Sequence, residues 1–313
     1  MPNTKILAGD CIESLKKLPD ASVNCCVTSP PYFGLRDYGC EGQIGLEETP
    51  EEFVTKLVAV FREVRRVLKD DGTCWVNMGD SYFSKQNSNR NGLNGSLGGG
   101  GVRGGGEYKT QKRNAGETAC KEKDLIGVPW MLAFALRADG WYLRQDIIWH
   151  KPNPMPESVT DRCTKAHEYI FLLSKSRQYY FDSESIKTES KSKSEGVRFG
   201  GNKYGDNEDK KFATKSGNVS KEYTKANKRS VWSVNTHSYR EAHFATYPPD
   251  LIKPCILAGC PEGGVVIDPF GGSGTTAQVA MENGRNAILC ELNPEYVKII
   301  EKRLGKVDPL FNS

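Results

Sequence analysis

Short hydrophobic runs alternate with amphipathic stretches along most of the chain, and glycine, proline or asparagine separates them. The clearest amphipathic stretch opens with Thr49-Pro50-Glu51-Glu52, which supplies an N-cap, a proline at the first helical position and a glutamate three residues after the cap. Apolar residues then recur at helical spacing until Asp71-Gly72, which we expect to stop the helix. Helical patterns also occupy 129–140, 275–284 and 295–304, and strand patterns occupy 23–28, 73–79, 141–151, 168–176, 263–270 and 286–292. This alternation predicts an α/β fold with a doubly wound, mostly parallel sheet.

Two polar segments interrupt this alternation. Residues 84–124 hold nine glycines between positions 92 and 106 and almost no apolar side chains, which predicts a mobile Gly-rich loop. Residues 183–230 are rich in Lys, Ser, Asn and Gly, with aromatic residues interspersed. The first segment has eight Lys/Arg against four Asp/Glu and the second has twelve against seven, so the rest of the chain is net acidic although the total is +4. Such segments suit contact with a polyanion such as nucleic acid, while solvated flexible loops would give the same pattern.

Composition narrows the class of protein. The 313 residues are 37% hydrophobic and 26% charged, which is ordinary for a globular protein able to bury a core. No apolar run is long enough to span a membrane, and the first residues lack the apolar region of a signal peptide, so we expect a cytoplasmic protein with no membrane partner. The ten cysteines are scattered without a CxxC pair, which favours reduced thiols and no metal site.

The stretch VVIDPFGGSGTT, residues 265–276, places an acidic residue, an aromatic residue and a glycine cluster between a strand and a helix. In a doubly wound sheet this turn lies at the carboxyl end of a strand, where ligands bind, and glycines let a ligand approach the backbone. Asp268 would repel a pyrophosphate, so a cofactor with a positive centre and no phosphate fits better. Glu291 ends the next strand, about where an acidic side chain takes ribose hydroxyls. S-adenosylmethionine meets these requirements, although an ordinary strand-to-helix turn would give the same pattern.

A second motif, Ser29-Pro30-Pro31-Tyr32, stands directly after the strand at 23–28. An exocyclic amino group on a base is a poor nucleophile, because its lone pair is delocalised into the ring. Prolines fix a backbone carbonyl rigidly and add no competing N–H donor, and the serine adds a second acceptor for the amino hydrogens. The tyrosine ring offers a face on which a base extruded from the duplex would stack. A rigid turn after a strand is the alternative interpretation.

Together these motifs resemble the amino-methylating DNA methyltransferases, in particular the permuted group whose S/D/N-P-P-Y motif precedes the F-x-G-x-G motif. Ser29-Pro30-Pro31-Tyr32 and the stretch Phe270–Gly274 match in that order. Three weaker segments agree: 6–11 resembles the family's segment near the adenine end of the cofactor, 243–252 the segment near its methionine end, and 147–158 the segment near the target base. The resemblance covers about 200 residues, and the two basic segments lie outside it.

The resemblance implies a methyltransferase fold of the S-adenosylmethionine-dependent type, with double-stranded DNA as substrate. It divides the chain into a catalytic part, 1–182, a candidate target-recognition insertion, 183–230, and a cofactor-binding part of the same domain, 231–313. It also implies a homodimer and a cognate restriction endonuclease as candidate partners. The catalytic assignment is Ser29, Pro30, Pro31 and Tyr32. The cofactor-binding assignment is Asp10, Cys11, Thr246, Pro248, Asp268, Phe270, Gly272, Gly274, Thr275 and Glu291.

The target atom is a choice between two amino groups. Serine at the first position is commoner in cytosine-N4 enzymes of the family and aspartate in adenine-N6 enzymes, so we favour cytosine N4 and keep adenine N6 as the alternative. A C5-cytosine enzyme would need a Pro-Cys pair after the glycine turn, whereas Pro254-Cys255 precedes it and falls in a helical pattern. A catalytically silent nucleic-acid-binding module is the alternative from another class, although neither motif carries a disabling change.

Two other positions are of interest. Asp80 follows a predicted strand, where it would face the pocket or cap a helix. Lys151 ends another strand, where contact with DNA phosphates and plain surface exposure are both consistent with the sequence.

Overall fold

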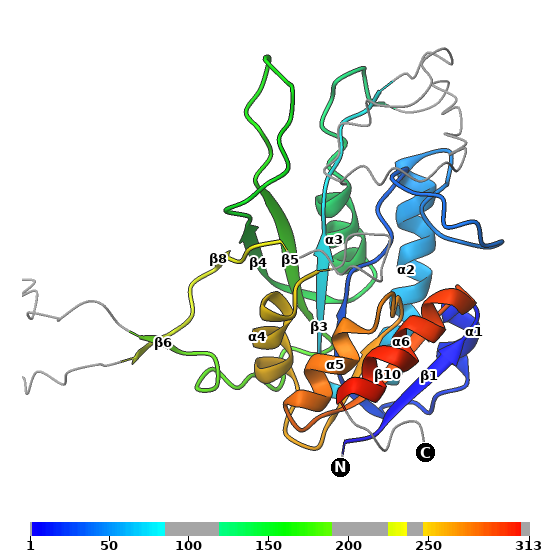
Figure 1. The fold of residues 1–313 in the computed structure, drawn as a ribbon, viewed down its shortest axis with the longest axis vertical. Helices are drawn as coiled ribbons and strands as arrows, with labels where there is room; N and C mark the ends of the chain where they lie inside the picture. Colours follow the sequence, from blue (N-terminus) through cyan, green and yellow to red (C-terminus); the bar gives the residue numbers. More distant parts are fainter. Residues whose placement is uncertain (1, 85–118, 190–224, 237–246, 308–313) are drawn as a thin grey trace, which may run out of the picture.

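The computed structural model describes residues 2–84, 119–189, 225–236 and 247–307. Within these residues the chain forms an eight-stranded sheet in the order β1-β10-β9-β2-β3-β5-β4-β8, and a separate two-stranded ribbon of β6 and β7 (Figure 1). The strands are β1 Thr4–Ala8, β2 Val23–Thr28, β3 Leu68–Met78, β4 Tyr142–His150, β5 His167–Ser174, β6 Thr188–Glu189, β7 Lys225–Ala226, β8 Val231–Ser233, β9 Val265–Asp268 and β10 Asn286–Glu291.

The sheet is mostly parallel, as the sequence predicts, with one strand reversed. β5 pairs antiparallel with both of its neighbours, β3 and β4, while the other pairs in the sheet are parallel. The segment between β4 and β5 has no helix, so β5 returns beside β4 as in a hairpin instead of crossing over. The first residues of β5 therefore lie at the edge of the sheet where its parallel neighbours end.

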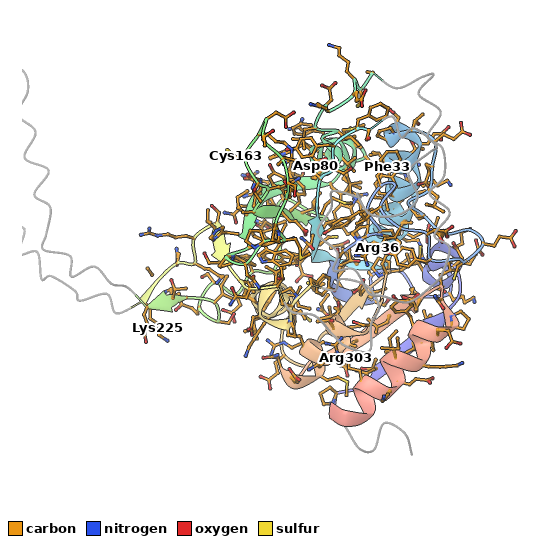
Figure 2. All side chains as sticks on the ribbon, turned by 45° about the horizontal axis from the view of Figure 1, so that its top comes forward. Phe33, Arg36, Asp80, Cys163, Lys225 and Arg303 are labelled. Carbon is orange, nitrogen blue, oxygen red and sulfur yellow. The ribbon has the colours of Figure 1, made fainter. Side chains whose placement is uncertain are left out.

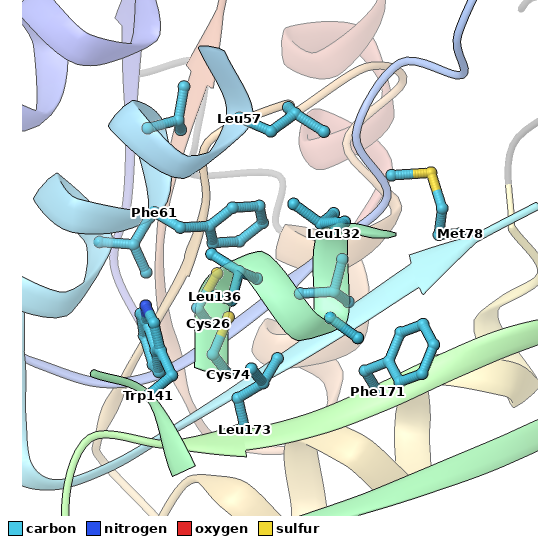
Figure 3. Close-up of a cluster of buried hydrophobic side chains, with 14 of the residues drawn as sticks. Cys26, Leu57, Phe61, Cys74, Met78, Leu132, Leu136, Trp141, Phe171 and Leu173 are labelled. Atoms are coloured by element: carbon cyan, nitrogen blue, oxygen red, sulfur yellow. The ribbon is translucent and has the colours of Figure 1, made fainter. Parts of the chain in front are cut away.

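Helices cover both faces of the sheet. One buried apolar cluster joins the sheet to α1, α2 and α3, as Figure 3 shows for Leu57 and Phe61 of α2 against Leu132 and Leu136 of α3. The other cluster joins the opposite face to α4, α5 and α6. The helices are α1 Cys11–Lys16, α2 Pro50–Val67, α3 Val128–Ala138, α4 Pro249–Gly259, α5 Thr275–Glu282 and α6 Pro294–Val307. Three layers of this kind are those of a doubly wound α/β fold.

The predicted start of α2 is confirmed and its predicted stop is wrong. Thr49 Oγ1 accepts a hydrogen bond from the Glu52 amide at 3.2 Å, so Thr49 is the N-cap. The helix ends at Val67, because the fully buried Leu68 already has extended backbone and opens β3. Asp71-Gly72 lie inside β3, where the pairing with β2 shifts register between Leu68 and Thr73. The turn signal was therefore real, but it marks an irregularity in the strand.

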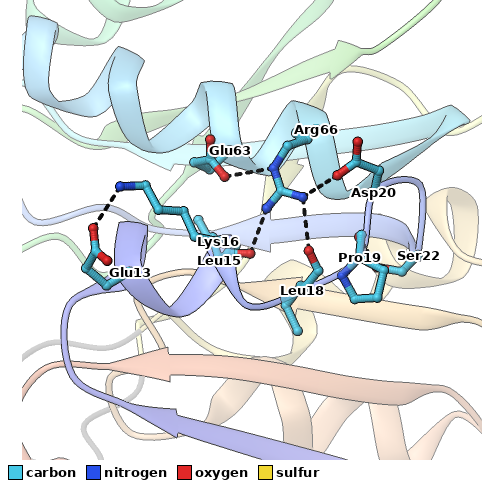
Figure 4. A network of polar contacts seen from close by, with 9 residues as sticks. All are labelled: Glu13, Leu15, Lys16, Leu18, Pro19, Asp20, Ser22, Glu63 and Arg66. Carbon is cyan, nitrogen blue, oxygen red and sulfur yellow. Dashed lines mark hydrogen bonds and ion pairs between the residues drawn. The ribbon is translucent and has the colours of Figure 1, made fainter.

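Arg66 of α2 fixes the turn that leads from α1 into β2 (Figure 4). Its guanidinium donates to the carbonyl oxygens of Leu15 at 2.8 Å and Leu18 at 3.0 Å, and it pairs with Asp20 and Glu63. Arginine thus adds donors to carbonyl groups in and just after the last turn of α1, where helical hydrogen bonding ends.

The cysteines and helices of the described residues show the following features. Cys255 lies in α4 and is 1% exposed, as its helical pattern predicts. All ten cysteines are described and are free thiols. In the described parts of the chain no group of three or more His, Cys, Asp or Glu could hold a metal ion. No helix among the described residues has the length and apolarity needed to cross a membrane.

The strand order fixes where a ligand would bind. From β2 the chain crosses through α2 to β3 on one side, and from β9 it crosses through α5 to β10 on the other. β2 and β9 are neighbours, so the order reverses between them. The crevice beyond the carboxyl ends of such a strand pair is the usual ligand site of doubly wound sheets.

Candidate active site

The two sequence motifs meet at this reversal point although they are far apart in the chain. Ser29–Tyr32 leave β2 and the glycine turn leaves β9. Thr28 Oγ1, at the end of β2, donates to Asp268 Oδ1, at the end of β9, at 2.6 Å, across 240 residues of sequence. The Pro-Pro-Tyr motif and the glycine motif therefore start from one hydrogen-bonded joint.

Asp268 is the centre of that joint. It is 1% exposed and accepts hydrogen bonds from Thr276 Oγ1 at 2.5 Å, Tyr247 OH at 2.9 Å and the Phe270 amide at 3.0 Å, besides that of Thr28. Burial raises the pKa of its carboxyl to about 6, and these donors act in the opposite direction. The main role of Asp268 is therefore to hold β2, β9, α5 and Tyr247 together. Because Asp268 is buried, its charge would reach a cofactor only across intervening protein atoms.

The glycine turn packs closely on β10 and α6. The Gly271 amide donates to the Cys290 carbonyl at 2.8 Å, and the Gly274 amide to the Gly271 carbonyl at 2.8 Å. Gly272 and Gly274 have positive φ angles of 52° and 81°, which glycine adopts readily. A Cβ at Gly274 would meet Ile300 at 3.1 Å, whereas one at Gly272 would meet only the Phe270 carbonyl at 3.8 Å. The turn is therefore tight toward α6 and open at Gly272.

Arg303 of α6 braces this turn and was missed by the sequence reasoning. Figure 2 labels this residue, which is 7% exposed. Its Nη1 donates to the Ser273 carbonyl at 3.0 Å, Ser273 Oγ at 2.9 Å and Thr275 Oγ1 at 2.9 Å. Its Nε donates to Gln278 Oε1. Thr275, assigned to the cofactor, is thus engaged by Arg303 and 3% exposed. The sequence offered one signal that Arg303 would be buried: it lies beside the apolar positions Ile300 and Leu304 in the helical pattern.

Glu291 lies beside the glycine turn at the end of β10. Its carboxylate accepts from the Gly272 amide at 2.7 Å and the Asn293 amide at 2.9 Å, and its carbonyl accepts from Gly9 at 2.8 Å. Burial raises the pKa of this carboxyl to about 7. The bond to Gly272 brings the predicted ribose acceptor and the glycine motif together.

Asp10 and Cys11 stand at the end of the neighbouring strand, β1, where α1 begins. Asp10 Oδ1 caps α1 by accepting from the Glu13 amide at 3.0 Å. Cys11 is 8% exposed, and burial with the nearby Asp10 charge raises its thiol pKa to about 12, so it is an unreactive thiol. A Cβ at Gly9 would meet no atom within 4 Å, so the backbone before Asp10 borders open space.

The Pro-Pro-Tyr turn is fixed by contacts of Tyr32 with Gly79 and with β5. Pro30 is buried and Ser29, Pro31 and Tyr32 are half-buried. The Tyr32 ring packs on Gly79, where a Cβ would come within 2.6 Å of Tyr32 Cε2. Its hydroxyl donates to Glu168 Oε2 of β5 at 2.6 Å. The tyrosine is therefore fixed at its ring edge and at its hydroxyl.

Of the other residues assigned to the cofactor, Phe270 and Pro248 lie in the described parts of the chain and Thr246 does not. Phe270 is half-buried against the α1–α3 side of the core, and Pro248 is the N-cap of α4. Thr246 lies outside the described residues. Its neighbour Tyr247, which the sequence reasoning did not select, reaches Asp268 and Thr276.

Asp80 caps a helix. Its carboxylate accepts from the amides of Gly127 at 3.0 Å and Val128 at 3.3 Å at the start of α3, and from Ser81 at 2.9 Å. Lys151, the other position of interest, is 2.5 Å from Glu168 Oε1.

These groups fit S-adenosylmethionine. The open backbone at Gly9 and Gly272 leaves room, Glu291 offers a carboxylate to ribose hydroxyls, and both Asp268 and Glu291 are acids whose charged form a cation would stabilise. We expect Glu291 and the Gly272 turn to hold it between the ends of β9, β10 and β1.

Comparisons with known proteins identify the family and the fold of the chain. The model of a family described as DNA methylase, N6_N4_Mtase, matches residues 23–302. The chain is 45% identical over 312 residues to the Type II methyltransferase M.Cfr9I of Citrobacter freundii, covering 97% of this chain and 88% of that protein.

Two solved structures show the same fold. The PvuII DNA methyltransferase, described as cytosine-N4-specific, has a TM-score of 0.64 at 19% identity, covering 99% of this chain and 92% of that one. A protein of Thermus thermophilus, TTHA0409, described as a putative DNA modification methylase complexed with S-adenosyl-L-methionine, has a TM-score of 0.60 at 23% identity, with 98% and 95% covered.

Replacing Gly274 by alanine should weaken cofactor binding. Gly274 and Gly127 are both helix N-caps with φ near 80°, but a Cβ at Gly127 meets no atom within 4 Å. Both Gly→Ala variants should lose about 1 kcal/mol of unfolding free energy from the left-handed backbone. Only G274A should also raise the dissociation constant of S-adenosylmethionine, by roughly tenfold, in calorimetry. Equal affinities for the two variants would contradict the placement of the cofactor at this turn.

Cofactor affinity should rise with pH. Ribose hydroxyls donate to a carboxylate, so binding favours deprotonated Glu291, whose pKa in the free protein is about 7. Below that pKa the cofactor must first displace a proton, so affinity should increase up to about tenfold between roughly pH 6 and pH 8. Calorimetry of wild type and E291Q across this range tests the idea. E291Q should bind more weakly and lack the step near pH 7, and an unchanged step would assign it to another group.

Proposed function

The chain belongs to the amino-methylating DNA methyltransferases, and from this premise we propose that it methylates the N4 amino group of cytosine at a specific site in double-stranded DNA. The coarser activity follows from the family: an S-adenosylmethionine-dependent enzyme transfers a methyl group to an exocyclic amino group of DNA. The observation that carries the proposal is the Thr28–Asp268 bond, because it starts the Pro-Pro-Tyr turn and the glycine turn from adjacent strand ends.

Each motif has a distinct task in this reaction. When bound, S-adenosylmethionine supplies a methyl group whose bond to sulfur breaks as the bond to the amino nitrogen forms. Ser29 and the adjoining carbonyl accept the amino hydrogens and restore lone-pair density on nitrogen, which otherwise conjugates with the ring. Tyr32 stacks on the extruded base and holds it in line. Because attack is direct, orientation by these fixed groups supplies most of the acceleration.

Ser29 supports cytosine as the target base. Serine at this position is commoner among the cytosine-N4 members of the family, and the PvuII enzyme that shares the fold is described as cytosine-N4-specific. Adenine N6 remains the alternative target, since both amino groups need the same two acceptors.

We propose that residues 183–230 recognise the target sequence, between a catalytic part, 1–182, and a cofactor-binding part, 231–313. The described ends of this segment are held together, since β6 pairs with β7 through Thr188 with Ala226 and Glu189 with Lys225. This ribbon stands away from the body of the protein (Figures 1 and 2). β8 then returns to pair with β4, the strand that leads into the segment resembling the family's target-base region.

The relatives also bear on possible partners of this chain. M.Cfr9I is named a Type II methyltransferase, and we propose a cognate restriction endonuclease for this chain as well. We also propose that the enzyme acts on cytoplasmic DNA as a homodimer.

Incubation with unmethylated DNA and S-adenosylmethionine should yield N4-methylcytosine, measured by mass spectrometry of digested nucleosides. Tyr32→Ala should lower the yield at least about tenfold, because the base loses its stacking surface, and should leave cofactor affinity unchanged. N6-methyladenine would keep the mechanism and contradict the choice of base. If DNA of diverse sequence gave no methylated nucleoside while still binding tightly, the protein would be a silent binding module.

Replacing residues 190–224 by a short Gly-Ser linker should remove sequence selectivity. The linker joins Glu189 to Lys225, which are already paired, so the sheet should fold and bind S-adenosylmethionine with wild-type affinity. Sequencing of methylated sites would show random or absent modification. The matched control replaces residues 85–118. Retained selectivity in the first variant and lost selectivity in the control would move recognition to the Gly-rich segment.

A further inference from the structure

A line of charged and polar groups backs Tyr32 on the side away from the glycine turn. Tyr32 OH donates to Glu168 Oε2 at 2.6 Å, and Lys151 Nζ donates to Glu168 Oε1 at 2.5 Å. Asn77 Nδ2 donates to the same Oε2 at 3.2 Å. Glu168 therefore collects three donors on its two oxygens, and one of them is the hydroxyl of the proposed base-stacking residue.

The network spans three adjacent strands. Asn77 lies on β3 and Glu168 on β5, while Lys151 follows β4. Trp149 pairs with Glu168 in the sheet, and the Lys151 ammonium lies 4.4 Å from the Trp149 ring centroid. Glu168 reaches Tyr32 only because β5 is reversed, which puts the first residues of that strand at the catalytic edge.

The environment favours a strong bond between the phenol and the carboxylate. The Lys151 and Glu168 side chains are 20% and 13% exposed, so water screens the pair weakly. Burial and the Glu168 charge raise the pKa of Tyr32 well above its ordinary value, so the hydroxyl stays protonated and donates. A phenol that donates to a carboxylate at this distance forms a charge-assisted hydrogen bond, about twice as strong as a neutral one.

A purely structural ion pair would not need the tyrosine. Glu63 and Arg66 provide the comparison: they lie 2.8 Å apart on α2, with side chains 22% and 29% exposed. Arg66 otherwise contacts the end of α1 and the turn after it, which lie outside the Pro-Pro-Tyr turn. Glu168 differs in directing its second oxygen to Tyr32.

We propose that Glu168 is a positioning residue for methyl transfer, which fixes the tilt of the Tyr32 ring against the extruded base while Lys151 balances its charge. This inference rests on the proposed function, because it requires Tyr32 to stack on the base. As the amino nitrogen forms its bond to carbon it becomes positive, until it releases a proton to water. A ring whose hydroxyl donates to a carboxylate is richer in electrons, and its face attracts that positive charge.

The test compares E168Q, Y32F and the double variant with E63Q as the matched control. E168Q keeps the size of the side chain and removes its charge, and Y32F leaves the Glu168–Lys151 pair intact. Each should lower the single-turnover rate of methyl transfer by roughly tenfold, with the dissociation constant of S-adenosylmethionine unchanged. The double variant should be no slower than the slower single variant, because E168Q weakens and Y32F removes the same hydrogen bond. E63Q should keep the wild-type rate.

Several results would overturn the proposal. They are additive losses in the double variant, a wild-type rate in Y32F, or the same loss in E63Q as in E168Q. Thermal unfolding checks that E168Q folds; if it does not, Y32F alone decides, since it leaves the ion pair in place. A wild-type rate in Tyr32→Ala would instead contradict the base-stacking role on which the proposed function depends.

Discussion

One buried carboxylate, that of Asp268, fixes the geometry on which the rest of the site depends. Parallel strands bring their carboxyl ends to one edge of the sheet, but pairing alone does not set the direction in which the chain leaves each strand. Asp268 sets it for β2 and β9 together, because it accepts from Thr28, from Phe270 and from Thr276 at once. A buried charge is tolerated only where donors surround it, so the joint has one satisfied arrangement.

The reversal of β5 gives the catalytic side its own support. A parallel β5 would place Glu168 at the opposite edge of the sheet, about 20 Å away for a strand of this length. The antiparallel arrangement places it where it meets Tyr32 and Lys151. The cofactor side is braced in the corresponding way by Arg303, which ties the glycine turn to α6. Each motif thus depends on a charged residue distant in sequence.

Local signals were sufficient for much of the fold. Three features each depend on a short stretch of local sequence: the cap at Thr49, the strand before Ser29 and the glycine turn after Asp268. The structure places them as predicted. The direction of β5 and the partners Tyr247, Arg303 and Glu168 depend on contacts across many residues, which one sequence does not reveal. The end of α2 failed for a related reason: burial of Leu68 outweighed the turn signal of Asp71-Gly72.

On the cofactor side, the fold alone leaves two buried carboxylates electrostatically destabilised. Burial raises the pKa values of both Asp268 and Glu291, which means that their hydrogen bonds do not fully repay the loss of hydration. At neutral pH the free protein therefore holds carboxylates less stable than they would be in water. A ligand with a positive centre lowers that free energy when it binds nearby, and by linkage it draws both groups toward their charged forms. On the proposed placement, a sulfonium would gain from the same two charges that would repel a phosphate, so the penalty of burying them would contribute to selecting the cofactor.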